Sequence, residues 1–169
     1  NRLILDGRMR TYESCVYREK TAKAEEKLAN LIRYQIRHQN PCTYGDLDHE
    51  LDREESRLKV RLAPEQRQAI KTALTSGLCI ITGGPGTGKT TTVKAILNLY
   101  EGIYDRVALC APTGRAAKRL TELTGHSAST IHRLLEVDYS TGSVRFIHNE
   151  KNLLPFDVII LDEMSMVDV

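Results

Sequence analysis

The spacing of apolar residues divides the chain into a helical part and an alternating part. In the first forty residues, apolar side chains recur every three or four positions behind a Glu/Lys-rich face, at Ala24, Leu28, Leu31, Ile32 and Ile36. This period is typical of an amphipathic helix, and we expect Asn40-Pro41 to stop it. From Thr43 to Lys59 the sequence is acidic and polar, which predicts short helices that join two units. We place a boundary near Val60, so that residues 1–61 form a smaller all-α region.

Beyond this boundary, short apolar runs alternate with helical patterns. Three of the runs suit strands buried on both faces of a parallel sheet. These runs are residues 78–81, 107–110 and 158–161. Helices are predicted around them at residues 64–77, 90–100, 115–123 and 131–136. The alternation indicates a doubly wound α/β domain over residues 62–169.

A turn signal interrupts this pattern near the end of the chain. Ser140-Thr141-Gly142-Ser143 lies between the apolar-containing segments 137–139 and 144–146. Two such segments joined by four turn residues predict a β-hairpin over residues 137–147.

Composition places the chain among ordinary soluble proteins. Its 169 residues are 41% hydrophobic and 27% charged, and its longest apolar runs fall far short of the roughly 20 residues that a membrane helix needs. No basic segment precedes an apolar core near Asn1, so we expect a cytoplasmic protein with no membrane partner. The four cysteines (Cys15, Cys42, Cys79 and Cys110) are too widely spaced for a CxxC metal pair, which indicates reduced, structural residues.

The net charge of +2 conceals a separation of signs. Residues 106–133 carry five basic side chains against Glu122 alone, whereas residues 134–169 are strongly acidic. The basic residues are Arg106, Arg115, Lys118, Arg119 and Arg133. Such a strip can bind phosphates, and a solvated helix face is the alternative.

A glycine-rich loop carries the strongest chemical signal. Residues 83–90 read Gly-Gly-Pro-Gly-Thr-Gly-Lys-Thr and lie between a predicted strand and a predicted helix. This pattern is the P-loop motif, in which backbone N–H groups surround a phosphate chain and the helix dipole adds to the attraction. Lys89 then reaches the β- and γ-phosphates, and the Thr90 hydroxyl is a candidate ligand of Mg²⁺. A glycine-rich turn without a ligand is the alternative.

Two adjacent carboxylates follow the last predicted strand. Asp162 and Glu163 lie at its carboxyl end, where ligands bind in open α/β sheets. We expect Asp162 to hold the metal, directly or through water, and Glu163 to polarise an attacking water, which points to hydrolysis. Taken alone, the pair is more typical of a strand that ends in a charged turn.

Gln66 is a candidate for selecting the base of the nucleotide. It lies in the first turn of the helix predicted from Pro64, and a glutamine amide can pair with adenine through one donor and one acceptor. An exposed helical glutamine without a ligand is the alternative.

Five segments, taken in order, resemble the motifs of one family. The strings LAPEQRQAI, ITGGPGTGKTTT, CAPTGRAAKRL, STIHRLLE and VIILDEMSMVD are similar to the Q motif and motifs I, Ia, Ib and II of superfamily 1 DNA helicases of the RecD/TraA type. This group contains the α subunit of exodeoxyribonuclease V. The similar segments cover residues 62–168, and the specificity comes from the third and fourth strings, since a lone P-loop occurs in many unrelated enzymes.

The resemblance implies a fold and a set of site residues. The fold is a RecA-like ATPase domain, the first of the two in such a motor. Catalysis would rest on Lys89, Asp162 and Glu163. The nucleotide would contact Gln66, Gly84, Pro85, Gly86, Thr87, Gly88, Lys89, Thr90 and Thr91, with Mg²⁺ held by Thr90 and Asp162. Single-stranded DNA would contact Pro112, Thr113, Gly114, Arg115, Thr130 and His132, although His132 by itself is as typical of a surface or core position.

The resemblance also implies an activity. It is that of an ATP-dependent DNA helicase with 5′-to-3′ polarity in recombination and repair, whose partners are single-stranded DNA, duplex junctions and subunits of a nuclease complex. The 137–147 hairpin lies where these helicases carry a β-pin that helps to split the duplex, and a plain connecting hairpin is the alternative. The second RecA-like domain and its arginine finger would lie beyond motif II, so we expect residues 1–169 alone to hydrolyse ATP slowly or not at all. Two other functions stay open from the residues: a P-loop kinase of small molecules, and a non-catalytic, nucleotide-dependent interaction module.

Overall fold

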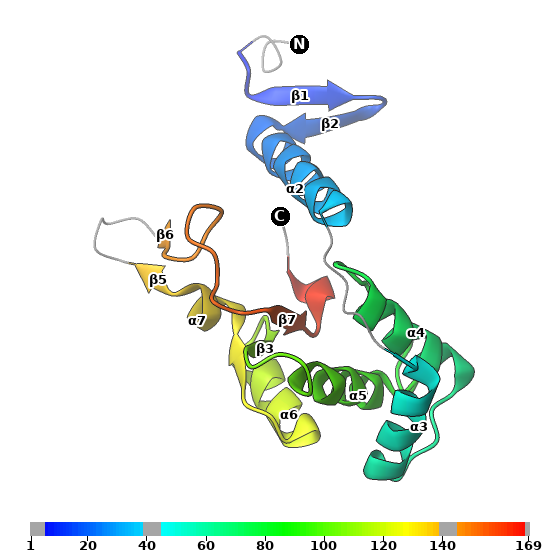
Figure 1. The fold of residues 1–169 in the computed structure, drawn as a ribbon. Helices are drawn as coiled ribbons and strands as arrows, with labels where there is room; N and C mark the ends of the chain where they lie inside the picture. The colour runs from blue at the N-terminus through cyan, green and yellow to red at the C-terminus, as the bar shows by residue number, and fades with distance from the viewer. Residues whose placement is uncertain (1–5, 39–44, 139–144, 168–169) are drawn as a thin grey trace.

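The computed structural model describes residues 6–38, 45–138 and 145–167. The chain forms a mixed α/β structure in which helices pack against a small parallel sheet (Figure 1). The elements in chain order are β1 (Met9–Tyr12), β2 (Cys15–Arg18), α2 (Glu19–Arg37), α3 (Leu47–Leu58), α4 (Pro64–Thr75), α5 (Lys89–Glu101), β3 (Val107–Ala111), α6 (Gly114–Thr124), β4 (Ala128–Thr130), α7 (Ile131–Leu135), β5 (Val137–Asp138), β6 (Arg145–Phe146), β7 (Val158–Leu161) and the 3₁₀ helix η1 (Met164–Met166).

The central sheet has three parallel strands in the order β4-β3-β7. Leu109 lies opposite Ala128 on one side and Ile160 on the other, so the carboxyl ends of all three strands reach the same edge. This arrangement confirms the predicted α/β class with a parallel sheet. The sequence does not predict strand β4, because three residues are too few to show a hydrophobic period.

The predicted strand at residues 78–81 is not formed. A strand needs a neighbour for its backbone hydrogen bonds, and no described segment pairs with this run. Cys79 and Ile81 still pack against the core, whereas Ile80 is 80% exposed. A cavity of about 750 Å³ is lined by this run and by β7. The apolar run thus correctly predicts that residues 78–81 are partly buried, but the prediction that they hydrogen-bond to the sheet as a strand is wrong.

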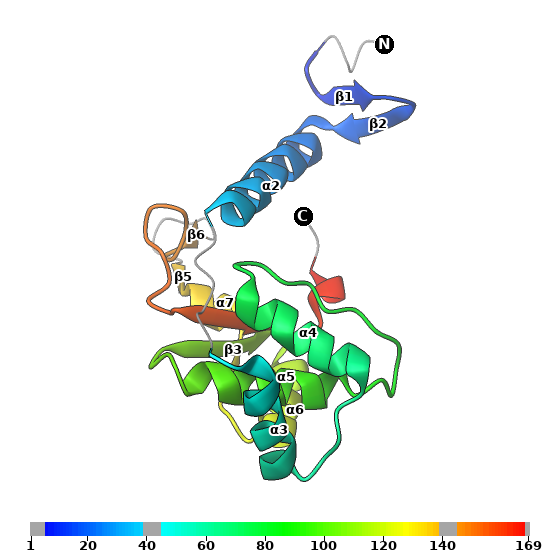
Figure 2. The same ribbon diagram turned by 45° about the vertical axis from the view of Figure 1, so that its right-hand side comes forward.

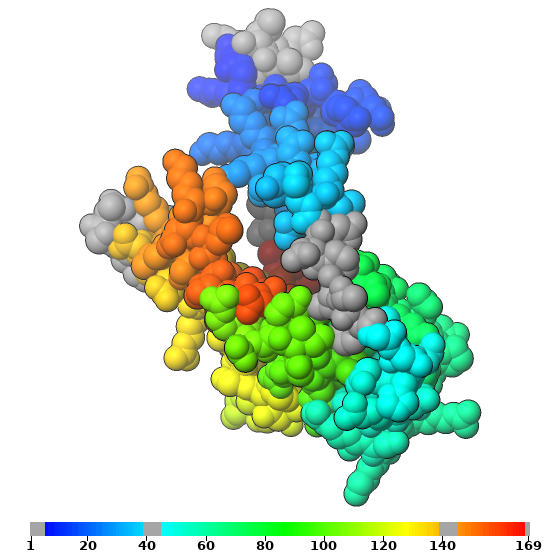
Figure 3. Space-filling view, in the orientation of Figure 1, coloured from blue at the N-terminus to red at the C-terminus, as the bar shows by residue number. Residues whose placement is uncertain are grey.

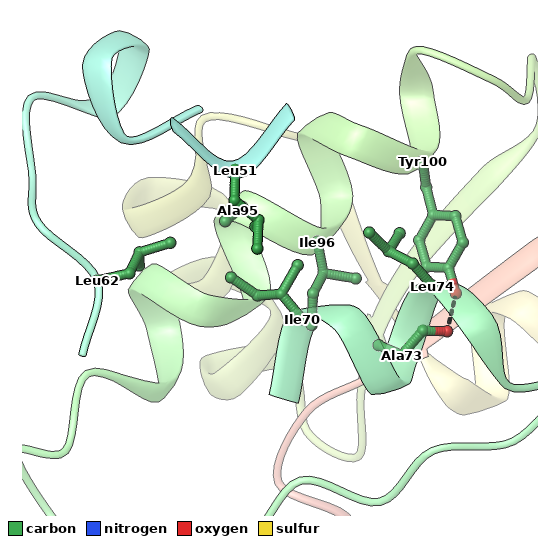
Figure 4. Close-up of a cluster of buried hydrophobic side chains, with 8 residues drawn as sticks. All are labelled: Leu51, Leu62, Ile70, Ala73, Leu74, Ala95, Ile96 and Tyr100. Atoms are coloured by element: carbon green, nitrogen blue, oxygen red, sulfur yellow. Dashed lines mark hydrogen bonds between the residues drawn. The ribbon is translucent and has the colours of Figure 1, made fainter. Parts of the chain in front are cut away.

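Helices α3, α4 and α5 enclose the main hydrophobic core. The buried side chains drawn in Figure 4 are Leu51, Leu62, Ile70, Ala73, Leu74, Ala95, Ile96 and Tyr100. The hydroxyl of Tyr100 donates to the carbonyl of Ala73 over 2.6 Å, so the polar end of this buried side chain has a hydrogen-bond partner within the apolar cluster. A second cluster joins α5, β3 and α6 through Leu97, Leu109 and Leu120. These contacts fix α5, which begins at the end of the glycine-rich loop, against α6.

Helix α3 packs with the α/β domain rather than with the segment before it. Leu51 is fully buried in the core shared with α4 and α5. Arg67 of α4 forms ion pairs with Asp52 and Asp48 at 2.8 and 3.1 Å, and these carboxylates raise the pKa of Arg67. The buried Glu54 carboxylate accepts a hydrogen bond from Asn98 of α5. We therefore propose that the boundary of the α/β domain lies before α3 rather than near Val60.

The chain before α3 is not all helical. Strands β1 and β2 form an antiparallel hairpin with Tyr12 opposite Cys15, so the predicted all-α region is wrong for residues 9–18. β-branched and aromatic residues favour strands over helix here, and Glu13 takes the positive φ (51°) that the tight turn requires. Arg10 forms ion pairs with Glu19 and Glu26, which hold the hairpin against α2.

The hairpin and α2 project away from the α/β domain in both ribbon views (Figures 1 and 2). The predicted helix is confirmed as α2, which ends at Arg37, while Asn40-Pro41 lies outside the described residues. Lys27 of α2 forms an ion pair of 2.7 Å with Glu150, which lies in the segment that follows β6. Figure 3 shows a hollow between α2 and the segment that follows β6.

The second hairpin is confirmed where the structure describes it. Strands β5 and β6 pair antiparallel, with Val137 opposite Phe146. Its turn, residues 140–143, lies outside the described residues.

Three of the four cysteines lie in the described residues. Among the described residues, Cys15, Cys79 and Cys110 are free thiols. Burial raises the pKa of Cys110 to about 11, so its thiol stays protonated at neutral pH. In the described part of the chain we find no helix with the length and apolarity needed to cross a bilayer, and no group of three or more His, Cys, Asp or Glu side chains placed to hold a metal.

Candidate nucleotide-binding site

The glycine-rich loop, residues 83–90, leads directly into α5. Gly86 and Gly88 adopt positive φ values of 73° and 77°, which side chains other than glycine rarely take. A Cβ at Gly88 would also collide with the amide nitrogen of Gln66. The Thr87 hydroxyl donates to the Gly84 carbonyl over 2.9 Å and closes the turn. The loop therefore has the backbone shape that its glycines predict.

Lys89 folds back over this loop. Its ammonium group donates to the carbonyls of Gly83 and Gly84 over 2.6 and 2.7 Å. These contacts place a positive charge above the loop, beside the first turn of α5. A phosphate chain surrounded by the loop would offer the ammonium stronger, charged acceptors.

The two carboxylates follow β7 at the carboxyl edge of the sheet. The Asp162 backbone N–H donates to the Cys110 carbonyl over 3.0 Å, which continues the pairing of β7 with β3. The Asp162 carboxylate accepts the Glu163 N–H over 2.9 Å. Glu163 itself has a φ of 54°, a strained conformation for a non-glycine residue. Such strain persists where surrounding structure holds it, often at functional sites.

A pocket of about 500 Å³ brings the loop and the carboxylates together. Its volume lies within the range of ligand sites, roughly 300–1,000 Å³. The residues that line it are Pro85, Gly86, Thr87, Gly88, Lys89, Thr90, Ala116, Arg119, Leu120, Leu123, Asp162 and Glu163. Of the residues expected at the nucleotide, Gly84, Gln66 and Thr91 are not in this lining.

Gln66 lies against the loop from the other side. Its amide nitrogen donates to the carbonyls of Thr87 and Gly88 at 3.2 and 3.4 Å, while its amide oxygen accepts the Ala63 N–H at 2.8 Å. The last contact caps α4, whose preceding residue, Ala63, has no capping side chain. Gln66 is thus tied to the loop, and both groups of its amide are hydrogen-bonded to the protein backbone.

The residues expected to contact DNA meet at the same edge of the sheet. Ala111 of β3 lies opposite Thr130 of β4, so the segments that follow both strands emerge side by side. The hydroxyls of Thr113 and Thr130 cap α6 and α7 by accepting the N–H groups of Ala116 and Arg133, each over 3.2 Å. Both hydroxyls keep a proton to donate to a phosphate.

The remaining candidates around these caps differ in exposure. Pro112 is half-buried, whereas Gly114, Arg115 and His132 are exposed. The His132 ring lies 5.9 Å from that of Phe146, centroid to centroid, so α7 contacts the second hairpin. The histidine is a surface residue, and the alternative of a core position is excluded.

The basic strip expected over residues 106–133 is divided by the fold. Arg106 lies at the amino end of β3, away from the DNA candidates, and binds Asp157 through two hydrogen bonds of 3.2 and 2.9 Å. A strand about five residues long separates the two ends of β3 by roughly 15 Å. The prediction that Arg106 belongs to the strip is therefore wrong, because summing charge along a sequence ignores which end of a strand each residue occupies.

Arg119 is the site residue that sequence reasoning misses. The sequence places it in the basic strip, yet it lines the loop pocket together with Ala116, Leu120 and Leu123. These positions recur every three or four residues and so share one face of α6. That period is visible in the sequence, but it does not show that this face meets the glycine-rich loop.

Comparisons with known proteins agree with this geometry. The AAA domain family matches residues 66–169. The chain is 40% identical over 157 residues to the ATP-dependent RecD2 DNA helicase of Deinococcus radiodurans, an alignment that covers 93% of this chain and 21% of that protein. It is 47% identical over 128 residues to the RecBCD enzyme subunit RecD of Mycolicibacterium smegmatis, covering 62% of this chain and 23% of that protein. The corresponding subunit of Haemophilus influenzae is 40% identical over 128 residues, with 62% and 20% covered. The chain thus spans about a fifth of the length of these relatives.

Proposed function

Since this chain belongs to the AAA domain family and is similar to RecD-type helicases, we propose that it forms the ATP-binding and ATP-hydrolysing part of a DNA motor. The observation that carries the proposal is the loop pocket, in which a P-loop lysine faces two carboxylates from the end of a parallel strand. A glycine-rich turn without a ligand would not need an acidic pair in the pocket that it lines. The names of the relatives support ATP as the nucleotide and DNA as the polymer along which the motor would move.

Each group in the pocket has a role in this proposal. The loop N–H groups and Lys89 bind the phosphates, and Glu163 orients and deprotonates the attacking water. Thr90 and Asp162 supply the oxygen donors that suit Mg²⁺, which would neutralise phosphate charge when bound. Gln66 contacts the adenine from its position against the loop.

The adjoining edge of the sheet supports a path for single-stranded DNA. The carboxyl ends of β3 and β4 bring Thr113, Arg115 and Thr130 to one surface, which also carries the exposed His132. Arg115 lies in the first turn of α6, four residues before Arg119 of the pocket lining, so one side of this helix would reach from the nucleotide toward the DNA. The second hairpin contacts α7 and would adjoin a duplex junction.

The family resemblance extends the proposal to the longer protein. It supports 5′-to-3′ movement, a role in recombination and repair, a cytoplasmic location, and subunits of a nuclease complex as partners. Residues 1–169 by themselves would hydrolyse ATP slowly.

We predict that Arg115→Ala weakens binding of single-stranded DNA to this chain. Removing one phosphate contact should reduce the slope of log affinity against log salt by about 0.7 for a single strand, and the affinity should fall roughly three- to tenfold at low salt. Fluorescence anisotropy of a labelled oligonucleotide at several salt concentrations measures both quantities.

Arg106→Ala is the matched control for this experiment. It removes the same charge from the other end of β3, where Asp157 already neutralises it, and it should leave DNA affinity unchanged. Equal losses of affinity in the two variants would show that DNA responds to overall charge and would contradict the proposed path.

A further inference from the structure

Arg119 enters the loop pocket from a helix whose position is fixed. Thr113 caps the start of α6, and Gly125 ends it with a φ of 82°. Ala116, Ala117 and Leu120 are buried along its inner side. With both ends capped and one face packed, the register of the helix is set, so the backbone of Arg119, an exposed residue, is fixed at the pocket wall.

Within the described part of the chain, the guanidinium of Arg119 has no protein partner. Among residues 6–38, 45–138 and 145–167, neither a hydrogen bond nor an ion pair involves Arg119, although Asp162 and Glu163 line the same pocket. Arg67 and Arg106, by contrast, are both paired with carboxylates. An arginine that lines a pocket with acidic walls and pairs with no described residue is available to a ligand.

The charges of the pocket show what that ligand would be. Among the described residues of the lining, the cations are Lys89 and Arg119, and the anions are Asp162 and Glu163. Without Arg119, the lining would hold one ammonium and two carboxylates, of which Asp162 is proposed to hold Mg²⁺. Arginine balances this charge, and its planar fork binds two phosphate oxygens at once.

We propose that Arg119 binds the terminal phosphate of ATP. This inference rests on the proposed function and deepens it. Lys89 and the loop hold the phosphates from one wall, while Arg119 lies on the α6 wall that shares the pocket with Glu163, the residue proposed to orient the attacking water. A contact of Arg119 with the phosphate under attack would distinguish ATP from ADP, and it would link the nucleotide to the helix that carries Arg115.

The test compares two nucleotides on Arg119→Ala and Arg119→Lys variants of this chain. Calorimetric titrations use the Mg²⁺ complexes of ADP and of AMPPNP, an ATP analogue that is not hydrolysed. Removing a bidentate charged hydrogen bond should weaken AMPPNP binding by roughly 10- to 100-fold in Arg119→Ala, and by less in Arg119→Lys, which keeps the charge without the fork. ADP, which lacks the contacted group, should change in affinity by less than about threefold.

Arg53→Ala is the control, because it removes an exposed arginine of α3 outside the pocket. Thermal unfolding of each variant verifies the fold. If Arg119→Ala binds AMPPNP as the unaltered chain does, or loses affinity for AMPPNP and ADP equally, the assignment to the terminal phosphate is wrong while the nucleotide site stands. If the unaltered chain binds neither nucleotide, the proposed function fails and the inference with it.

Discussion

Replacing Lys89 with alanine should weaken binding of Mg²⁺-ATP to residues 1–169 by roughly 10- to 100-fold, the effect of losing a charged hydrogen bond to phosphate. The ammonium lies 2.6 and 2.7 Å from the carbonyls of Gly83 and Gly84, directly above the loop. In the bound state these neutral acceptors would be exchanged for phosphate oxygens. A fluorescent ATP analogue, displaced by unlabelled ATP, measures the affinity.

Lys94→Ala is the matched control for this substitution. Lys94 has the same side chain on the same helix, α5, and is not part of the pocket lining. Its removal should leave ATP affinity unchanged. Indistinguishable affinities of the Lys89 and Lys94 variants would show that the nucleotide does not sit in the glycine-rich loop.

Replacing Glu163 with glutamine should separate ATP binding from ATP hydrolysis. The amide keeps the size of the carboxylate but cannot accept a proton from water. In the protein that carries this chain, we expect phosphate release to fall roughly 10²- to 10⁴-fold, the usual contribution of a general base, while ATP affinity is retained or increases. Phosphate release and nucleotide titration give the two quantities.

Glu122→Gln controls for the change of charge, because Glu122 is exposed on α6 and does not line the pocket. A Glu163→Gln variant that still hydrolyses ATP at the unaltered rate would exclude Glu163 as the base. Another group of the protein would then have to activate the attacking water. A protein that binds ATP and releases no phosphate even without the substitution would instead favour the non-catalytic interaction module.

The local geometry of the site can be predicted from the sequence, because its causes are local. Glycines at positions 86 and 88 permit the positive φ values that the loop adopts. Pro64 marks the start of α4, and the threonines that precede α6 and α7 cap those helices. The expectation that strand ends share one edge places Asp162 near the glycine-rich loop, and both line one pocket, although the run before the loop forms no strand in the structure.

The errors concern contacts between segments far apart in the chain. An apolar run shows that residues 78–81 are partly buried, but a strand also needs a partner that the run itself does not specify. Arg106 and Arg115 are both basic and close in sequence, yet a whole strand separates them. Which face of α6 meets the pocket depends on how α5 and β3 pack against Leu120, so the position of Arg119 cannot be predicted from its spacing.

The measurement that tests the central claim most directly is phosphate release from ATP by the protein that carries this chain, with and without single-stranded DNA. A DNA motor should release phosphate faster when the oligonucleotide is present, and the increase should vanish in Glu163→Gln. Hydrolysis that DNA leaves unchanged, and that a small-molecule phosphate acceptor increases instead, would contradict the motor and identify a P-loop kinase.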